Sequence, residues 1–212
     1  MKRGRRKVEN PATARRILAA AEQQFATQGM AGARTDEIAA AAHANKAMLY
    51  YYFGSKQQLH RAVLEHLFGQ LREVVYAPSA PDATPRDRLF AFVNGYFNFI
   101  ATHPNYPSLV QREAMSATPK FEWIVREYFR PFHQHLGGLI EEGIASGEFR
   151  KVDAHNTVFT LLGMMVFYFA AAPVMSKLVG QNLLSAPALE KRRRALLDFV
   201  DHGLIRKEAR PR

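Results

Sequence analysis

The chain has 212 residues, 48% of them hydrophobic, so it is long enough and apolar enough to fold around one or two cores. It contains no cysteine, which excludes disulfides, thiol nucleophiles and thiolate metal sites. Lysine and arginine outnumber aspartate and glutamate by 29 to 19, and the resulting net charge of +10 favours a polyanionic partner such as nucleic acid or an anionic membrane surface.

The N-terminal segment is strongly basic. Within the first sixteen residues, seven lysines and arginines stand against a single acidic residue, Glu9. Residues 1–11 are therefore expected to form a basic arm. The opening sequence MKRGRRKVEN leads into no apolar segment of the signal-peptide type, so a cytoplasmic location is expected.

The first predicted helix follows this arm. Asn10 and Pro11 form a typical helix start, because an asparagine can cap the helix and proline fits its first turn. Apolar residues then recur at helical spacing from Ile17 to Phe25, and Gly29 is expected to end the helix. The spacing predicts that this helix buries one face.

Two short helices and a longer one are predicted next. Thr35 is the expected N-cap of the first short helix, and Asn45 is the expected N-cap of the second, which covers residues 46–53. Ser55 is expected to cap the longer helix. Two short helices joined by a tight turn and braced by longer ones form a helix-turn-helix, so residues 12–76 are predicted to be a DNA-binding domain.

The sequence TDEIAAAAHANKAMLYYYFGSKQQL resembles the DNA-binding segment of the TetR family of bacterial transcriptional repressors. The residues that match the family pattern are Thr35, Ile38, Ala39, Ala42, Leu49, Tyr50, Tyr52, Phe53, Ser55, Lys56 and Leu59. The sequence departs from the pattern in the turn, where His43-Ala44-Asn45 replaces Gly-Val-Ser. Because that glycine often has a positive φ, which histidine tolerates less well, His43 is expected to strain or reshape the turn.

The resemblance implies two groups of DNA contacts: Thr35, Tyr50 and Lys56 contact phosphates, and Lys46, Ala47, Met48 and Tyr51 approach bases. Asn45 caps the helix that carries them, and Tyr52 lies near the DNA backbone or packs against the longer helix. Lys46 is expected to donate to guanine O6 or N7. The alternative interpretation of the three consecutive tyrosines is an aromatic patch in the core.

The rest of the chain, residues 77–212, is predicted to form a larger ligand-binding and dimerisation domain. The Pro- and Ala-rich segment APSAPDATP, residues 77–85, is expected to be a linker. Helices are predicted over 86–103, over 105–117 as a shorter one, over 120–145 with a break at Pro131, over 154–180 after a cap at Asp153, and over 187–205. Because no segment has the pattern of a strand, the predicted fold class is all-α.

A membrane span has to be considered for residues 154–176, which contain no Asp, Glu, Lys or Arg. The uninterrupted apolar run covers 15 residues, 161–175, whereas a span needs about 20. A helix that is apolar on every side is otherwise one that is covered on every side. We therefore expect no membrane partner, and a helix with one face against the interior of its own domain and the other against the helices of a dimer partner.

No catalytic residue, metal site or cofactor is expected, because the sequence has no nucleophile motif, phosphate-binding loop or suitably spaced metal ligands. A small-molecule pocket is expected instead, since aromatic residues and methionines are concentrated in this half and the resemblance places the effector between its helices. The expected lining residues are Phe97, Met115, Tyr128, Phe132, Met164, Phe167 and Tyr168. Such a lining predicts an apolar or aromatic effector.

A homodimer is expected, because one short helix-turn-helix contacts only one half of a palindromic site. The two C-terminal helices are the expected interface, with contacts from Phe159, Leu162, Leu196, Phe199 and Val200. The sequence thus predicts a ligand-responsive transcriptional regulator of the repressor type that binds a palindromic operator. A basic membrane-associated protein and a helical small-molecule carrier remain as alternatives.

Overall fold

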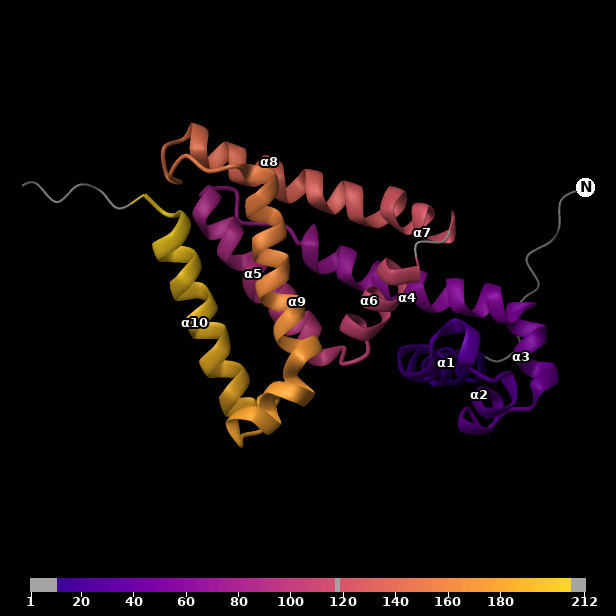
Figure 1. Ribbon diagram of the computed structural model, residues 1–212. Coiled ribbons are helices and arrows are strands. Elements are labelled where there is room, and N and C mark those ends of the chain that lie inside the picture. The colour runs from indigo at the N-terminus through magenta and orange to yellow at the C-terminus, as the bar shows by residue number, and fades with distance from the viewer. Residues whose placement is uncertain (1–10, 117–118, 207–212) are drawn as a thin grey trace, which may run out of the picture. The chain divides into compact units, whose positions relative to one another are not determined.

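The computed structural model describes residues 11–116 and 119–206, and within them every regular element is a helix (Figure 1). The predicted all-α fold is confirmed. Residue contacts group the chain into two units, Met1–Gln70 with Ser108–Met115, and Leu71–Pro107 with Ser116–Arg212. The domain boundary expected at residue 76 stays a prediction, and the basic arm falls almost entirely outside the described residues.

The first unit contains α1 (Pro11–Gly32), α2 (Thr35–Ala41), α3 (Lys46–Phe53), most of α4 (Lys56–Val75) and the larger part of α6 (Tyr106–Ser116). Fully buried apolar side chains recur at helical spacing along α1 and α4, so each of these helices buries one face. Gly29 has a φ of 69°, which ends the regular part of α1 where the sequence predicted. The core of this unit is formed by Ile17, Ala21, Phe25, Ile38, Leu49, Leu59, Val63 and Leu67.

The second unit is built around α5 (Pro85–Thr102), which contacts the three other long helices of the unit. These are α8 (Arg130–Ala145), α9 (Ala154–Val179) and α10 (Ala186–Leu204). α7 (Pro119–Ile124) precedes α8 and leads into it through a π-helix, Val125–Phe129. The buried face of α5 carries Leu89, Val93, Phe97 and Ile100.

The π-helix differs from the sequence prediction, which placed the interruption at Pro131. Pro131 instead fits into the first turn of α8, and the irregular turn lies just before it. Proline has no N–H and its ring clashes with the carbonyl four residues earlier, so the preceding turn widens instead of continuing as an α-helix.

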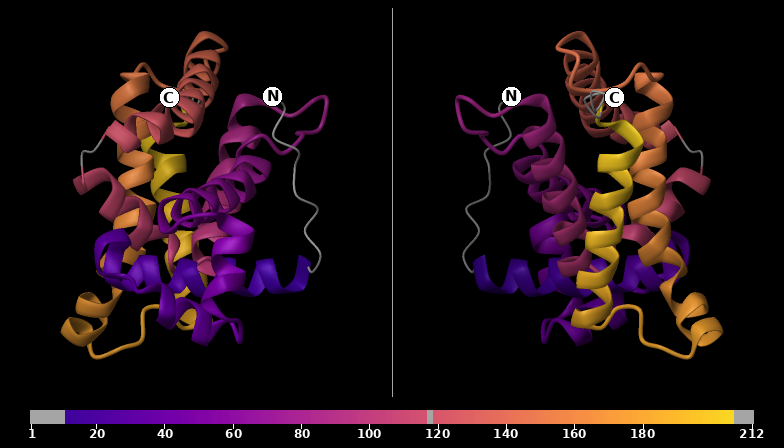
Figure 2. Two further views of the ribbon diagram at one scale, coloured as in Figure 1. Left: turned by 90° about the vertical axis from the view of Figure 1, so that its right-hand side faces the viewer. Right: turned by 90° about the vertical axis from the view of Figure 1, so that its left-hand side faces the viewer.

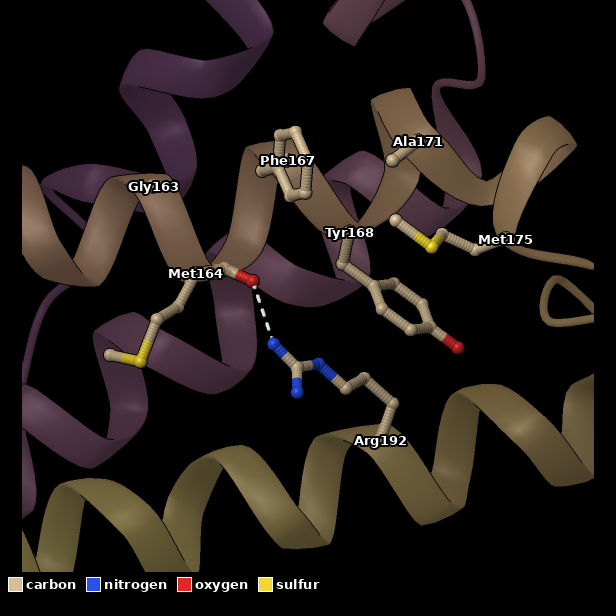
Figure 3. A pocket seen from close by; sticks show the side chains of 7 residues that line it. All are labelled: Gly163, Met164, Phe167, Tyr168, Ala171, Met175 and Arg192. Atoms are coloured by element: carbon tan, nitrogen blue, oxygen red, sulfur yellow. Dashed lines mark hydrogen bonds between the residues drawn. The ribbon is translucent and has the colours of Figure 1, made fainter. Parts of the chain in front are cut away.

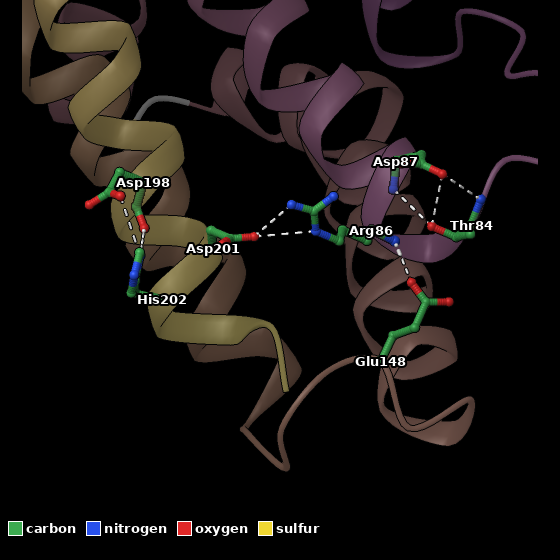
Figure 4. Close-up of polar contacts among 7 residues, drawn as sticks. All are labelled: Thr84, Arg86, Asp87, Glu148, Asp198, Asp201 and His202. Atoms are coloured by element: carbon green, nitrogen blue, oxygen red, sulfur yellow. Dashed lines mark hydrogen bonds and ion pairs between the residues drawn. The ribbon is translucent and has the colours of Figure 1, made fainter. Parts of the chain in front are cut away.

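The start of α5 is fixed by a group of polar contacts (Figure 4). Thr84 and Asp87 form a capping box, in which each side chain accepts from the other residue's backbone N–H. The Arg86 guanidinium donates to Asp201 Oδ1 on α10 at 2.8 Å, and its backbone N–H donates to Glu148 Oε2 at 3.1 Å. These contacts fix α5 to α10 and to the segment that follows α8.

α9 and α10 are joined by residues 180–185, and α10 runs roughly antiparallel to α9 (Figure 2). The Asp153 side chain caps α9 by accepting from the backbone N–H of Asn156 at 2.7 Å, as the sequence predicted. α9 is long and apolar enough to cross a membrane, since its most apolar window has a mean hydropathy of 2.0. Only 22% of that window is buried inside the protein. One face of α9 packs inside the unit, and the opposite face is apolar and exposed.

Candidate nucleic-acid interface

The turn between α2 and α3 brings the two short helices into helix-turn-helix geometry. The Ala44 N–H donates to the Ala39 carbonyl at 2.9 Å, which closes the turn. The Asn45 side chain caps α3 by accepting from the Met48 N–H at 2.8 Å. His43 has a φ of 50°, so it occupies the left-handed conformation that the family's glycine would adopt more easily, and the expected strain is confirmed.

α3 has one buried and one exposed side. Leu49 is fully buried, as is Ile38 of α2, and this anchors the helix in the core of the first unit. Tyr50 and Tyr51 are 40% and 43% exposed, so they do not belong to an aromatic core patch. Tyr52 is half-buried, and its ring lies 5.2 Å from that of Tyr51. The exposed side of α3 can therefore present two phenol hydroxyl groups to a polar partner.

Two of the predicted phosphate contacts lie together. The Thr35 hydroxyl is 3.5 Å from the Tyr50 hydroxyl. Thr35 is not the N-cap of α2, however: Arg34 has the extended backbone of a cap, and its carbonyl accepts from the Ile38 N–H at 3.0 Å. The helix thus begins one residue earlier than expected, which leaves the Thr35 side chain available to face outward.

The basic side chains near α3 are already engaged. Lys46 pairs with Asp36 of α2 at 2.9 Å, and the pKa of Lys46 is raised because the Asp36 carboxylate accepts its hydrogen bond and carries the opposite charge. The Lys56 ammonium donates to the Ala31 carbonyl at 3.1 Å, next to the start of α2. Ala47 is exposed and Met48 half-exposed at the start of the helix. The predicted DNA-contacting side chains all lie on α2, on α3 with its N-cap Asn45, or at the start of α4.

Sequence reasoning missed the contribution of α6 to this unit. The Arg112 guanidinium donates to the carbonyls of Ala26 and Thr27 at 2.9 and 2.7 Å, near the end of the regular part of α1. His60 of α4 pairs with Glu113 at 3.1 Å, and both side chains are nearly buried. No local pattern could reveal these contacts, because their partners lie about 50 to 90 residues apart in sequence.

The seven predicted effector-binding residues do not form one cluster. Phe97 and Phe132 are buried in the core of the second unit, and Tyr128 lies in the π-helix. Met115 is 78% exposed and belongs to the first unit, which corrects the expectation that it lines a common pocket with the others. The remaining three residues are on α9.

These three, Met164, Phe167 and Tyr168, line a hollow of about 530 Å³ between α9 and α10 (Figure 3). Arg192 of α10 enters this α9–α10 hollow, donates to the Met164 carbonyl at 3.0 Å and lies 4.9 Å from the centre of the Tyr168 ring. The other lining residues are Gly163, Ala171 and Met175. Arg192 is thus the one charged residue in a lining that is otherwise mostly apolar.

The predicted dimer contacts fall into two classes. Phe159 and Phe199 are 63% and 61% exposed, and Leu162 is half-buried. Leu196 and Val200 are only 2% and 1% exposed, because α10 turns them toward the interior of the second unit. They contribute to the core of their own chain, which corrects the expectation that they contact a partner.

Additional exposed apolar residues lie on α9. The most exposed of them are Phe167, Val174 and Leu178, at 65%, 70% and 76%, and Val179 is 51% exposed. Together with Phe159 they form what we call the apolar face of α9. Within the described residues, no three His, Asp or Glu side chains are grouped to hold a metal ion.

Comparisons with known proteins agree with this geometry. Residues 17–63 match the family model of bacterial regulatory proteins of the tetR family, and residues 85–200 match that of the tetracyclin repressor-like C-terminal domain. The transcriptional repressor NicS of Pseudomonas putida is 31% identical over 155 residues, which cover 72% of this chain and 73% of the relative.

Solved structures show the same fold. The ketosteroid transcriptional regulator KstR2 of Mycobacterium tuberculosis superposes with a TM-score of 0.70 at 21% identity, covering 95% of this chain and 98% of its own. AibR, in complex with isovaleryl coenzyme A and operator DNA, superposes with a TM-score of 0.72 at 20% identity, covering 88% of this chain and 97% of its own. The chain therefore belongs to the TetR family and is a ligand-responsive, DNA-binding transcriptional regulator of the repressor type.

Proposed function

We propose that the protein binds a palindromic operator as a homodimer in the cytoplasm and releases it when an apolar or aromatic effector binds. The observation that carries this proposal is the division of α3, whose Leu49 side is anchored in the core while Lys46, Tyr50 and Tyr51 remain at the surface. A net charge of +10 supports a polyanionic partner.

α3 acts as the recognition helix in the major groove. Its residues 46–51 carry the base contacts, because residues near the start of a recognition helix reach base edges. These contacts come from Lys46, Ala47, Met48 and Tyr51. Phosphates are contacted by Thr35, Tyr50 and Lys56, and Tyr52 supports Tyr51 through their ring contact. Asn45 fixes the start of the helix.

The test compares two substitutions on DNA. An operator is first selected from random duplexes with the unaltered protein, and a scrambled duplex serves as reference. Tyr50→Phe should weaken binding to both duplexes alike, because a phosphate contact carries no sequence information. Lys46→Ala should weaken operator binding by about 1–3 kcal/mol more than scrambled binding, since a base contact is lost.

Lys151→Ala is the matched control, because Lys151 is exposed in the segment between α8 and α9, and removing its charge should change neither affinity. Equal losses on operator and scrambled duplex for Lys46→Ala would contradict its role as a base contact.

The homodimer forms through the apolar face of α9, to which Phe199 of α10 adds. Four large side chains on this face are more than 60% exposed in the single chain, and a second copy would remove them from water. A palindromic operator requires two half-site contacts, which a twofold dimer supplies.

The effector acts on the second unit. Aromatic and methionine side chains line its interior and the α9–α10 hollow, which suits an apolar or aromatic molecule. Mass spectrometry of small molecules that co-purify with the protein would identify the effector class. The same molecule should then release the selected operator, because effector and DNA binding must oppose each other reciprocally.

A membrane-associated protein is the competing interpretation of α9. A lone membrane-spanning helix is surrounded by lipid, whereas α9 buries Val158, Leu161 and Met165 against its own unit. The exposed remainder forms a single face, which suits a protein partner. Together with the family assignment, this favours the regulator.

A further inference from the structure

The ammonium group of Lys46 is held by a carboxylate from the neighbouring helix. Asp36 lies in the first turn of α2, ten residues earlier, and its two oxygens are 2.9 and 3.2 Å from Lys46 Nζ. Both side chains are about half exposed, on the same surface as Thr35 and Tyr50. The pair therefore lies among the residues that we expect to contact DNA.

The position of Lys46 explains why it needs a partner. Lys46 is the first residue of α3, and the unpaired N–H groups at the start of a helix make that end electropositive. A cation is disfavoured there unless an anion lies nearby. Asp36 supplies this anion, and the raised pKa of Lys46 reflects the hydrogen bond and the opposite charge.

Pairing changes what Lys46 can contribute to DNA binding. A free lysine is attracted to every phosphate, and each phosphate it neutralises adds about 0.9 to the salt slope of binding on any sequence. A lysine paired with Asp36 has little net charge to offer a phosphate. Its ammonium still has hydrogens that the carboxylate does not use, and these can be donated to guanine O6 or N7.

We propose that Asp36 is a specificity-determining residue, which holds the Lys46 ammonium at the base edges and suppresses its attraction to phosphates of any sequence. This inference rests on the proposed role of α3 as the recognition helix. Asp36 would thereby improve the selectivity of DNA recognition, although its own negative charge repels DNA.

The decisive variant is Asp36→Asn, which keeps the shape of the side chain and removes its charge. Freed Lys46 should add up to about 0.9 to the salt slope on the scrambled duplex, which corresponds to about eightfold tighter binding at 0.1 M salt. The selected operator should gain little, because Lys46 already contacts a base there. The ratio of operator to scrambled affinity should therefore fall by up to about eightfold.

Glu37→Gln is the matched control. Glu37 is the next residue of the same helix turn and is similarly exposed. Its carboxylate pairs with Arg34 at 3.8 Å, whereas that of Asp36 pairs with Lys46. Removing its charge should strengthen binding to both duplexes alike and leave their ratio unchanged. A ratio that falls equally in both variants would show a general charge effect and would overturn the proposal.

A second arm repeats Asp36→Asn in a Lys46→Ala background. The ratio should then no longer respond to the loss of Asp36, since the lysine that it holds is absent. A fall of the same size in this background would overturn the proposal and leave the recognition role of α3 intact. If the unaltered protein selects no operator, the proposed function itself fails, and this outcome is visible before any variant is measured.

Discussion

Phe167 offers a quantitative test of the dimer. Its side chain lies at the middle of α9 and is 65% exposed in the single chain. Burying a whole phenylalanine side chain contributes about 1.5–3 kcal/mol, so the exposed part can contribute about 1–2 kcal/mol per copy. A twofold interface contains the side chain twice, and Phe167→Ala should therefore weaken the dimer by about 2–4 kcal/mol, or about 30- to 700-fold in dissociation constant.

Sedimentation equilibrium measures this constant directly. Alanine favours the helix, and Phe167 is mostly outside the core, so the variant should fold normally and retain its helical circular dichroism. Met115→Ala is the control, because Met115 is 78% exposed but lies in the first unit. A dissociation constant for Phe167→Ala within threefold of the unaltered protein would refute the apolar face of α9 as the interface.

Two further predictions concern stability and the N-terminal arm. Gly143→Ala should lower the free energy of unfolding by about 1–3 kcal/mol in urea titrations, because the added methyl group would lie 2.3 Å from the Phe149 ring; Gly163→Ala, which meets no atom within 4 Å, should not. Deleting residues 1–7, which lie outside the described residues, should flatten the salt slope of DNA binding by about 0.9 for each lysine or arginine that contacts a phosphate. An unchanged slope would show that the arm makes no phosphate contacts.

The helix-turn-helix could be predicted from sequence because its determinants are local. Asn45 caps the helix that starts one residue later, and Leu49 has the spacing of a buried residue. The strained φ of His43 could also be anticipated, since the residue stands where the family has glycine. The exposure of Tyr50 and Tyr51 follows from helical geometry, because three consecutive residues cannot share one face.

The orientation of α10 could not be predicted in the same way. Leu196, Phe199 and Val200 are all apolar and close in sequence, so periodicity alone does not decide which of them faces outward. The structure turns Leu196 and Val200 inward and leaves Phe199 at the surface. The contacts that fix this rotation include Arg86 with Asp201, which are 115 residues apart and belong to no local pattern.

The contacts that α6 makes near both of its ends could not be predicted from the sequence either. At its start, the Tyr106 hydroxyl lies 2.9 Å from the Tyr96 hydroxyl of α5, and burial raises the pKa of Tyr106 so that both groups stay neutral and hydrogen-bonded. Near its other end, Arg112 and Glu113 hold α1 and α4 within the first unit. Tyr106 and Glu113 are only seven residues apart on one helix, about 10 Å along its axis.

A short helix of this kind moves as a rigid body, so a displacement at Tyr106 has to be taken up either by the Arg112 and Glu113 contacts or by the helix itself. If an effector repacks the aromatic core around Tyr96, we expect α6 to respond, since its residues, like those of α4, fall in both units. We therefore predict that substituting His60 or Glu113, which pair at 3.1 Å, changes how strongly the effector weakens DNA binding, as measured by titrating the selected operator with and without effector.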